Sequence, residues 1–181
     1  MEKSKGQDVV ERIVGWLSGY MSMPAEYALV CAVWAIHTWV SDRMDVTPYL
    51  CVTAATKGAG KTRLMVLLSM VSWGGKMAAD ISPAATYQVI EAYEGRVTLL
   101  FDEAEKMSAA SAGVMRSVMN AGYRQGQTVT RSVGMKPREY PVYCAKAFAL
   151  IGDVNDTLRD RSTVLTLSRG KPARDYVIGQ A

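Results

Sequence analysis

The fold is decided by one stretch of the sequence, Tyr49-Leu50-Cys51-Val52-Thr53-Ala54-Ala55-Thr56-Lys57-Gly58-Ala59-Gly60-Lys61-Thr62. Its first six residues form a short apolar run without alternation, which is typical of a strand buried on both faces of a sheet. The positions from Arg63 to Trp73 then predict a helix. A buried strand that runs through a short loop into a helix indicates an α/β fold.

The loop in this stretch fits most of the phosphate-loop template G-x-x-x-x-G-K-[ST]. Gly60-Lys61-Thr62 matches, whereas Ala55 stands at the first glycine position. Glycines at 58 and 60 let successive amides point inward at a helix N-terminus, as an anion nest does. We expect Lys61 to reach the β- and γ-phosphates and Thr62 to ligate Mg²⁺; a glycine-rich helix start with a solvated lysine is the alternative. The predicted nucleotide-binding residues are Thr56, Lys57, Gly58, Ala59, Gly60, Lys61, Thr62 and Arg63.

A second apolar strand, Arg96 to Phe101, ends in Asp102 and Glu103. Ligand sites of α/β sheets form at the carboxyl ends of the strands, so both carboxylates are expected there. Asp102 suits the surroundings of Mg²⁺, which keeps most of its waters. Glu103 suits the orientation and deprotonation of an attacking water. The pair favours hydrolysis over phosphotransfer, and a solvated turn is the alternative.

The remaining pattern predicts strands alternating with helices, and hence a three-layer αβα sandwich with a mostly parallel five-stranded sheet. A helical pair at 1–44 is expected to pack on a core at 45–181, within one compact domain. The predicted strands are 49–54, 76–79, 96–101, 147–151 and 162–167; the helices are 9–21, 24–43, 63–73, 82–93 and 109–120; a β-hairpin lies within 125–143, before the penultimate strand.

The composition is that of a globular domain: 181 residues, 49% hydrophobic and 21% charged, with a net charge of +4. The three cysteines are far apart and sit in apolar runs, which predicts buried free thiols and a reducing, cytoplasmic compartment. The most apolar stretch, 27–40, is too short for a comfortable membrane span and contains His37, so we expect a buried helix. We expect His37 to be a hydrogen-bonded core histidine, and a catalytic histidine is the alternative. The charged first residues do not lead into the apolar core of a secretory signal. No membrane partner is expected.

The run Leu158-Arg159-Asp160-Arg161-Ser162 resembles the arginine segment that precedes the last strand of AAA+ ATPases, including minichromosome-maintenance helicases. A closer resemblance covers most of the chain. It is to a P-loop domain found with primase-like and helicase-like replication proteins of phages and mobile elements. The segments that carry it are 32–38, 48–50, 60–62, 99–104, 120–123 and 156–162.

The resemblance implies an AAA+ (ASCE-type) ATPase that uses ATP and Mg²⁺ and forms an oligomeric ring with inter-subunit active sites. Arg161 is then the first candidate for a finger on the neighbour's nucleotide, and Arg159 the second; surface arginines paired with Asp156 and Asp160 are the alternative. Past the strand 147–151, the polar Asn155 and Asp153 are candidate γ-phosphate sensors.

The hairpin is basic, and in AAA+ helicases a hairpin at this place touches nucleic acid. Arg124, Arg131, Lys136 and Arg138 are therefore candidate contacts to single- or double-stranded DNA, although a solvated hairpin fits equally well.

The function implied is ATP hydrolysis coupled to unwinding, translocation or remodelling of DNA in phage or mobile-element replication. A nucleotide-dependent switch or loader for a helicase or primase, with slow turnover, is the alternative. AAA+ proteins usually carry a helical lid with a further arginine after the last strand, and residues 169–181 are too few for one. The chain is then a core fragment, or its N-terminal helices do part of the lid's work.

Overall fold

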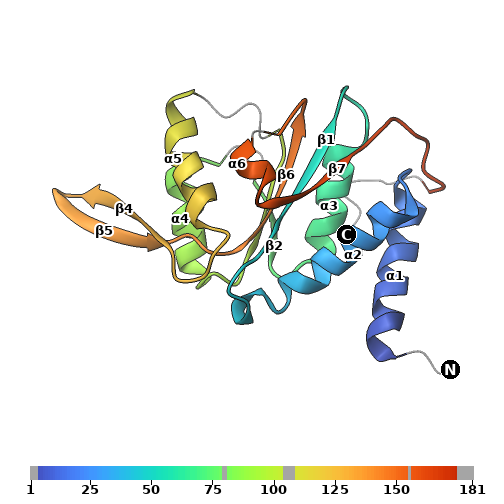
Figure 1. The fold of residues 1–181 in the computed structure, drawn as a ribbon, viewed down its shortest axis with the longest axis horizontal. Coiled ribbons are helices and arrows are strands. Elements are labelled where there is room, and N and C mark those ends of the chain that lie inside the picture. The colour runs from blue at the N-terminus through green and yellow to red at the C-terminus, as the bar shows by residue number, and fades with distance from the viewer. Residues whose placement is uncertain (1–3, 79–80, 104–108, 155, 175–181) are drawn as a thin grey trace.

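The computed structural model describes residues 4–78, 81–103, 109–154 and 156–174 and contains one five-stranded sheet (Figure 1). The strand order is β2-β3-β6-β1-β7, and every pairing between these neighbours is parallel. The α/β class and the parallel five-stranded sheet predicted from the sequence are thus confirmed. The strands are β1 (Tyr49–Ala54), β2 (Gly75–Met77), β3 (Thr98–Phe101), β6 (Ala145–Ile151) and β7 (Ser162–Thr166).

Helices cover both faces of this sheet, which gives three layers (Figure 1). On one face lie α1 (Lys5–Tyr20), α2 (Ala25–Thr38), the short 3-10 helix η1 (Ser41–Arg43) and α3 (Lys61–Val71). On the other face lie α4 (Pro83–Ala92), α5 (Ala109–Ala121) and α6 (Asp156–Arg159).

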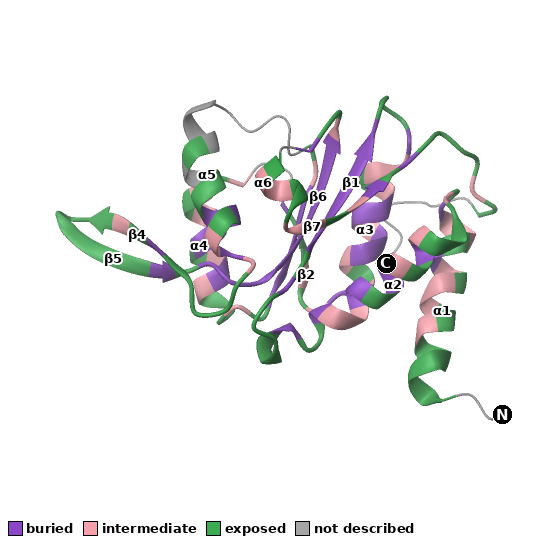
Figure 2. Cartoon of the chain, viewed as in Figure 1, coloured by how far each residue is buried: buried purple, intermediate pink, exposed green. Residues whose placement is uncertain are grey.

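The interior strand β1 is buried at all six positions, which explains its lack of polar alternation. Leu50 and Val52 belong to the apolar cluster that contains α3, whereas Tyr49 and Cys51 belong to the cluster that contains α4 and α5. Figure 2 shows β1 and β6 as buried strands in the interior of the molecule. All three cysteines are buried free thiols, as expected.

Helix α2 ends earlier than predicted, because the sequence pattern carried it to about Arg43 and the structure ends it at Thr38. The Thr38 hydroxyl donates to the Ala35 carbonyl at 2.6 Å and accepts from the Trp73 amide at 2.9 Å. This side chain joins the end of the helix to the connection after α3, and η1 follows as a separate turn. The expectation of a buried helix was also too broad, since Leu29 is 48% and Val33 52% exposed.

Two local predictions are confirmed by the hydrogen bonds of the structure. Ser82 is the N-cap of α4 and accepts from the Ala85 amide at 3.1 Å, with Pro83 at the first helical position. The predicted hairpin is present as β4 (Thr128–Val133) and β5 (Lys136–Pro141), which pair antiparallel and project from the body (Figure 1).

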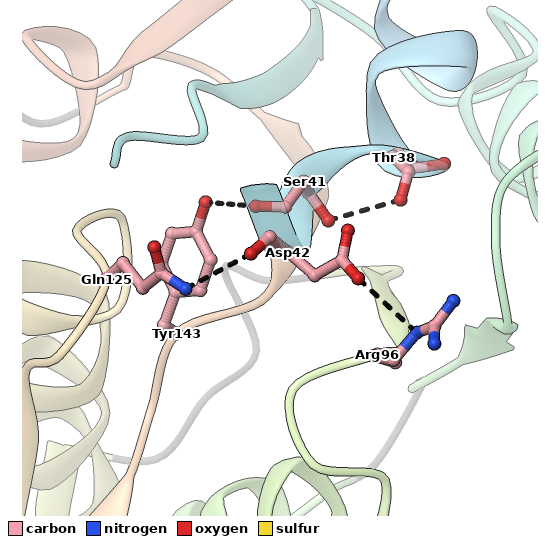
Figure 3. A network of polar contacts seen from close by, with 6 residues as sticks. All are labelled: Thr38, Ser41, Asp42, Arg96, Gln125 and Tyr143. Atoms are coloured by element: carbon pink, nitrogen blue, oxygen red, sulfur yellow. Dashed lines mark hydrogen bonds and ion pairs between the residues drawn. The ribbon is translucent and has the colours of Figure 1, made fainter. Parts of the chain in front are cut away.

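A buried tyrosine fastens the N-terminal helices to the sheet (Figure 3). The Tyr143 hydroxyl lies 2.7 Å from the carbonyl oxygens of Ser41 and Met44, either of which can accept its one hydrogen, and 2.6 Å from Thr47 Oγ1. His37 Nε2 lies 3.3 Å from the same Thr47 oxygen, so this histidine is hydrogen-bonded as expected, although only half-buried.

Asp42 on η1 makes two further contacts to the core (Figure 3). Gln125 Nε2 donates to the Asp42 carbonyl at 3.1 Å, and Arg96 Nε lies 3.7 Å from Asp42 Oδ2. The region before β1 is therefore joined to the core by polar contacts as well as by apolar packing. No helix within the described ranges has the length and apolar character needed to cross a membrane.

Candidate functional site

The candidate site lies at the carboxyl edge of the sheet, where β1, β6 and β3 end side by side. β6 pairs with β1 on one side, with Ala54 opposite Ile151, and with β3 on the other, with Phe101 opposite Phe148. β1 and β3 are therefore two strand spacings apart across the sheet, about 9.5 Å. β3 ends level with Cys51, so the carboxylates that follow it begin about three residues before the end of β1.

The loop after β1 contains two glycines with left-handed backbone. Gly58 and Gly60 have φ angles of +79° and +91°, in the left-handed region that side chains rarely adopt, and Gly60 is the residue before α3. A Cβ at Gly60 would lie 3.1 Å from Met21 Cε. Lys61 opens the helix half-buried and the Thr62 side chain is exposed on its first turn. These are the positions that the motif requires.

A cavity of about 420 Å³ opens against this loop. Its far wall is the joint between α1 and α2, where Arg63 Nη1 donates to the Tyr20 carbonyl at 3.5 Å. The cavity is of the size that proteins use for small ligands. Its lining residues are Tyr20, Met21, Ser22, Gly58, Ala59, Gly60, Lys61, Thr62, Arg63, Gly170 and Pro172. Of these, the sequence motif predicted 58–63 and missed the five others, whose positions follow from packing between distant segments.

Asp102 and Glu103 follow β3 directly, as predicted. Asp102 is half-buried and its Oδ1 accepts from the Glu103 amide at 3.1 Å. Glu103 has a φ of +53°, so the chain turns sharply there. The side chain of Glu103 is exposed. Left-handed backbone at a residue other than glycine is a small strain that clusters at functional sites.

The candidate sensors follow β6 at the same edge. Gly152 donates its amide to the Ala54 carbonyl at 3.3 Å, which ties the end of β6 to the start of the phosphate loop. Asp153 comes next and is exposed. Asn155 lies outside the described residues.

Arg159 and Arg161 lie at the opposite edge of the sheet. Ser162 pairs with Tyr49, the first residue of β1, so Arg161 is a whole strand length from the loop, roughly 17 Å. Neither arginine can therefore reach the loop of its own chain. The Arg161 guanidinium lies over the Tyr123 ring at 4.9 Å and donates to the Thr157 carbonyl at 2.7 Å. Arg159 is exposed.

Two of the hairpin's predicted nucleic-acid contacts are directed toward α4. Arg138 donates both of its close hydrogen bonds to the Glu91 carboxylate at 3.0 Å, and Arg131 lies over the Tyr87 ring at 5.9 Å. Arg131 and Arg138 face each other in register, an unfavourable pairing that these α4 side chains offset.

The hairpin tip instead presents an apolar residue and a lysine. Met135 is 97% exposed and Lys136 next to it is exposed. Arg124 is exposed in the connection before the hairpin, where its backbone forms an isolated antiparallel β-bridge with Val46. By the register of the hairpin Arg131, Lys136 and Arg138 share one of its faces, whereas Arg124 lies in the connection before it.

A buried lysine, Lys146 on β6, was not singled out from the sequence. It is 0% exposed, and its Nζ donates to the carbonyls of Gly122, Val142 and Cys144 at 2.8–3.2 Å. Burial lowers the pKa of this ammonium group. It joins the residue after α5 to the connection before β6, because Gly122 follows α5 and Val142 and Cys144 precede β6, and so it has a structural explanation.

Among the described residues no cluster of three or more histidine, cysteine or acidic side chains forms a preassembled metal site. Thr62 and Asp102 supply oxygen ligands of the kind that Mg²⁺ prefers, and a site of this type is completed by phosphate oxygens and water. Comparison of the chain with protein-family models and with curated proteins gives no match.

Proposed function

We propose that this chain is a Mg²⁺-dependent nucleoside-triphosphate hydrolase of the P-loop, AAA+-like type. One observation carries the proposal: the glycine loop after β1 and the Asp102-Glu103 pair after β3 meet at one edge of the sheet, on either side of β6. The strands that bear them are about 50 residues apart in the chain, so their meeting is independent of the loop motif itself. The position of β6 between β1 and β3 agrees with the resemblance to AAA+ ATPases.

The proposed roles follow from charge and position. Loop amides and Lys61 bind the phosphate chain, because the N-terminus of α3 adds a favourable dipole to the lysine charge. Thr62 and Asp102 would hold Mg²⁺, directly or through water, and the ion would supply positive charge to the phosphates. Glu103 orients the attacking water and accepts its proton. The nucleotide is ATP in this proposal.

We further propose that a second copy of the chain supplies an arginine to the site, so that hydrolysis takes place between two copies. A finger from Arg159 or Arg161 requires a second copy whose loop faces this edge, because neither can act within its own chain. We place Arg159 first, since Arg161 is already stacked on Tyr123 and bonded to Thr157. The resemblance then suggests a ring that acts on DNA during phage or mobile-element replication.

The test is phosphate release from ATP by the wild type and by Lys61→Ala and Glu103→Gln, measured over a range of protein concentrations. Lys61→Ala should lower nucleotide affinity and turnover together. Glu103→Gln should keep nucleotide binding and lower turnover by about 10²–10⁴-fold, the range typical of a lost general base. Lys5→Ala and Glu94→Gln are matched controls; Glu94 is another exposed glutamate with a left-handed backbone, φ +52°.

Three outcomes distinguish the versions of the proposal. Unchanged turnover in Lys61→Ala would refute the whole assignment. Turnover that rises more steeply than protein concentration, increases with single-stranded DNA and falls in Arg159→Ala supports the ring. Slow turnover that is linear in protein and indifferent to DNA refutes the motor and favours the switch or loader for a helicase or primase.

A further inference from the structure

An arginine after the last strand of the sheet, Arg169, rests on the phosphate loop. Its Nε and Nη2 donate to the Lys57 carbonyl at 3.1 and 2.9 Å. If Gly58 carried a Cβ, Nη2 would lie 3.3 Å from it, so the guanidinium occupies space that a side chain at position 58 would need. The sequence motif gives no sign of this contact, because the two residues are 112 positions apart.

The segment that carries Arg169 is fastened at both ends. At its start the Leu167 amide donates to the Thr53 carbonyl of β1 at 2.8 Å. At its end the Arg174 amide donates to the Gly19 carbonyl of α1 at 2.9 Å, and its guanidinium lies over the Tyr20 ring at 5.8 Å. The segment therefore crosses from the sheet to α1 over the phosphate loop, and Gly170 and Pro172 line the cavity there.

The Arg169 guanidinium donates two hydrogen bonds within the described part of the chain, fewer than it has donors for. A guanidinium has five N–H donors in a fork that matches a phosphate or carboxylate. Within the described part of the chain, both of its hydrogen bonds go to one carbonyl oxygen, and no carboxylate is paired with it. Arg169 is exposed, so solvent or a ligand can reach its remaining donors.

We propose that Arg169 is a phosphate-binding residue that acts on the nucleotide of its own chain. When the loop holds a triphosphate, the fork exchanges the Lys57 carbonyl for phosphate oxygens, because an anion is the stronger acceptor. Arg169 then adds a second cation to Lys61 and couples the segment 167–174 to ligand binding. This inference rests on the proposed function of the loop.

The test is equilibrium binding of a fluorescent ATP analogue and its displacement by inorganic tripolyphosphate, at fixed ionic strength. Arg169→Ala should weaken both ligands by about 10–100-fold, the effect of losing a hydrogen-bonded charge. Equal weakening is expected because the contact is to phosphate and not to the base. Arg43→Ala, an exposed arginine on η1, removes the same charge away from the loop and should change neither affinity.

Two further variants separate phosphate binding from a purely structural role. Arg169→Gln can still donate to the Lys57 carbonyl but has no charge, and it should bind as weakly as Arg169→Ala. Arg169→Lys should recover part of the affinity. Wild-type affinity in Arg169→Gln would overturn the inference, because it would show that Arg169 only holds the loop.

The failure of this inference is distinguishable from failure of the proposed function. If the wild type binds neither ligand, or Lys61→Ala binds them normally, the phosphate-loop assignment itself is wrong. If the wild type binds, Lys61→Ala does not, and Arg169→Ala matches Arg43→Ala, only the role of Arg169 is refuted. Thermal melting of each variant confirms that it is folded.

Discussion

Removal of the Tyr143 hydroxyl, by Tyr143→Phe, should destabilise the whole domain while leaving its ring packing intact. The hydroxyl can donate one hydrogen bond, to a carbonyl of Ser41 or Met44, and accept one from Thr47. Two hydrogen bonds at about 1 kcal/mol each, with a carbonyl left short of a donor, give a loss of about 2–3 kcal/mol. This is a sizeable part of the stability of an ordinary domain.

Urea unfolding followed by circular dichroism measures this loss. With a slope of about 2 kcal/mol per molar, the midpoint should fall by roughly 1 M with no change in slope. Tyr93→Phe is the matched control, since Tyr93 is 45% exposed and its hydroxyl has no hydrogen bond to any described residue. A loss below about 0.5 kcal/mol in Tyr143→Phe, within the range of a surface substitution, would refute the reasoning.

Three further predictions concern buried or crowded positions. Gly75→Ala should lower the free energy of unfolding by about 1–3 kcal/mol in the same titration, because its Cβ would overlap the Ser69 carbonyl oxygen; an unchanged midpoint would contradict this. Burial lowers the pKa of His37 below 6.5, so the unfolded chain binds the proton more readily. The stability of the wild type relative to His37→Asn should therefore be constant above about pH 6.5 and decline as the pH falls below it, and a pH-independent difference would exclude the effect. Burial raises the pKa of Cys31 to about 12 and that of Cys51 to about 11, so a thiol reagent at pH 8 should react with them only as the chain unfolds; rapid labelling of the native protein would contradict their burial.

The elements of this fold were predictable because each has a local signal. The run from Tyr49 to Ala54 lacks polar alternation since both of its faces are covered, and Ser82-Pro83 carries its own capping hydrogen bond. The position of Asp102-Glu103 was also predictable, since parallel strands place their carboxyl ends at one edge.

The contacts made by the arginines were not predictable from local sequence. Arg138 reaches Glu91 and Arg169 reaches Lys57 because the fold brings distant segments together, and no periodicity encodes that. The early end of α2 has the same cause, since the Thr38 hydroxyl bonds to the Trp73 amide beyond α3. Whether a basic residue is available to a ligand therefore depends on the partner that it contacts in the fold, and the residue type alone says less about this.

The order of strands in the sheet has a consequence for biosynthesis. β1 lies inside the sheet, between β6 and β7, and both of these neighbours are synthesised about 100 residues later. At 5–20 residues per second, the apolar run 49–54 emerges from the ribosome on the order of 5–20 s before either neighbour can pair with it. During that interval α3 and the N-terminal helices can cover only one face of the strand. The nascent chain is thus a natural client for a ribosome-associated chaperone. A chain truncated after β3 would lack β6, the strand that lies between β1 and β3.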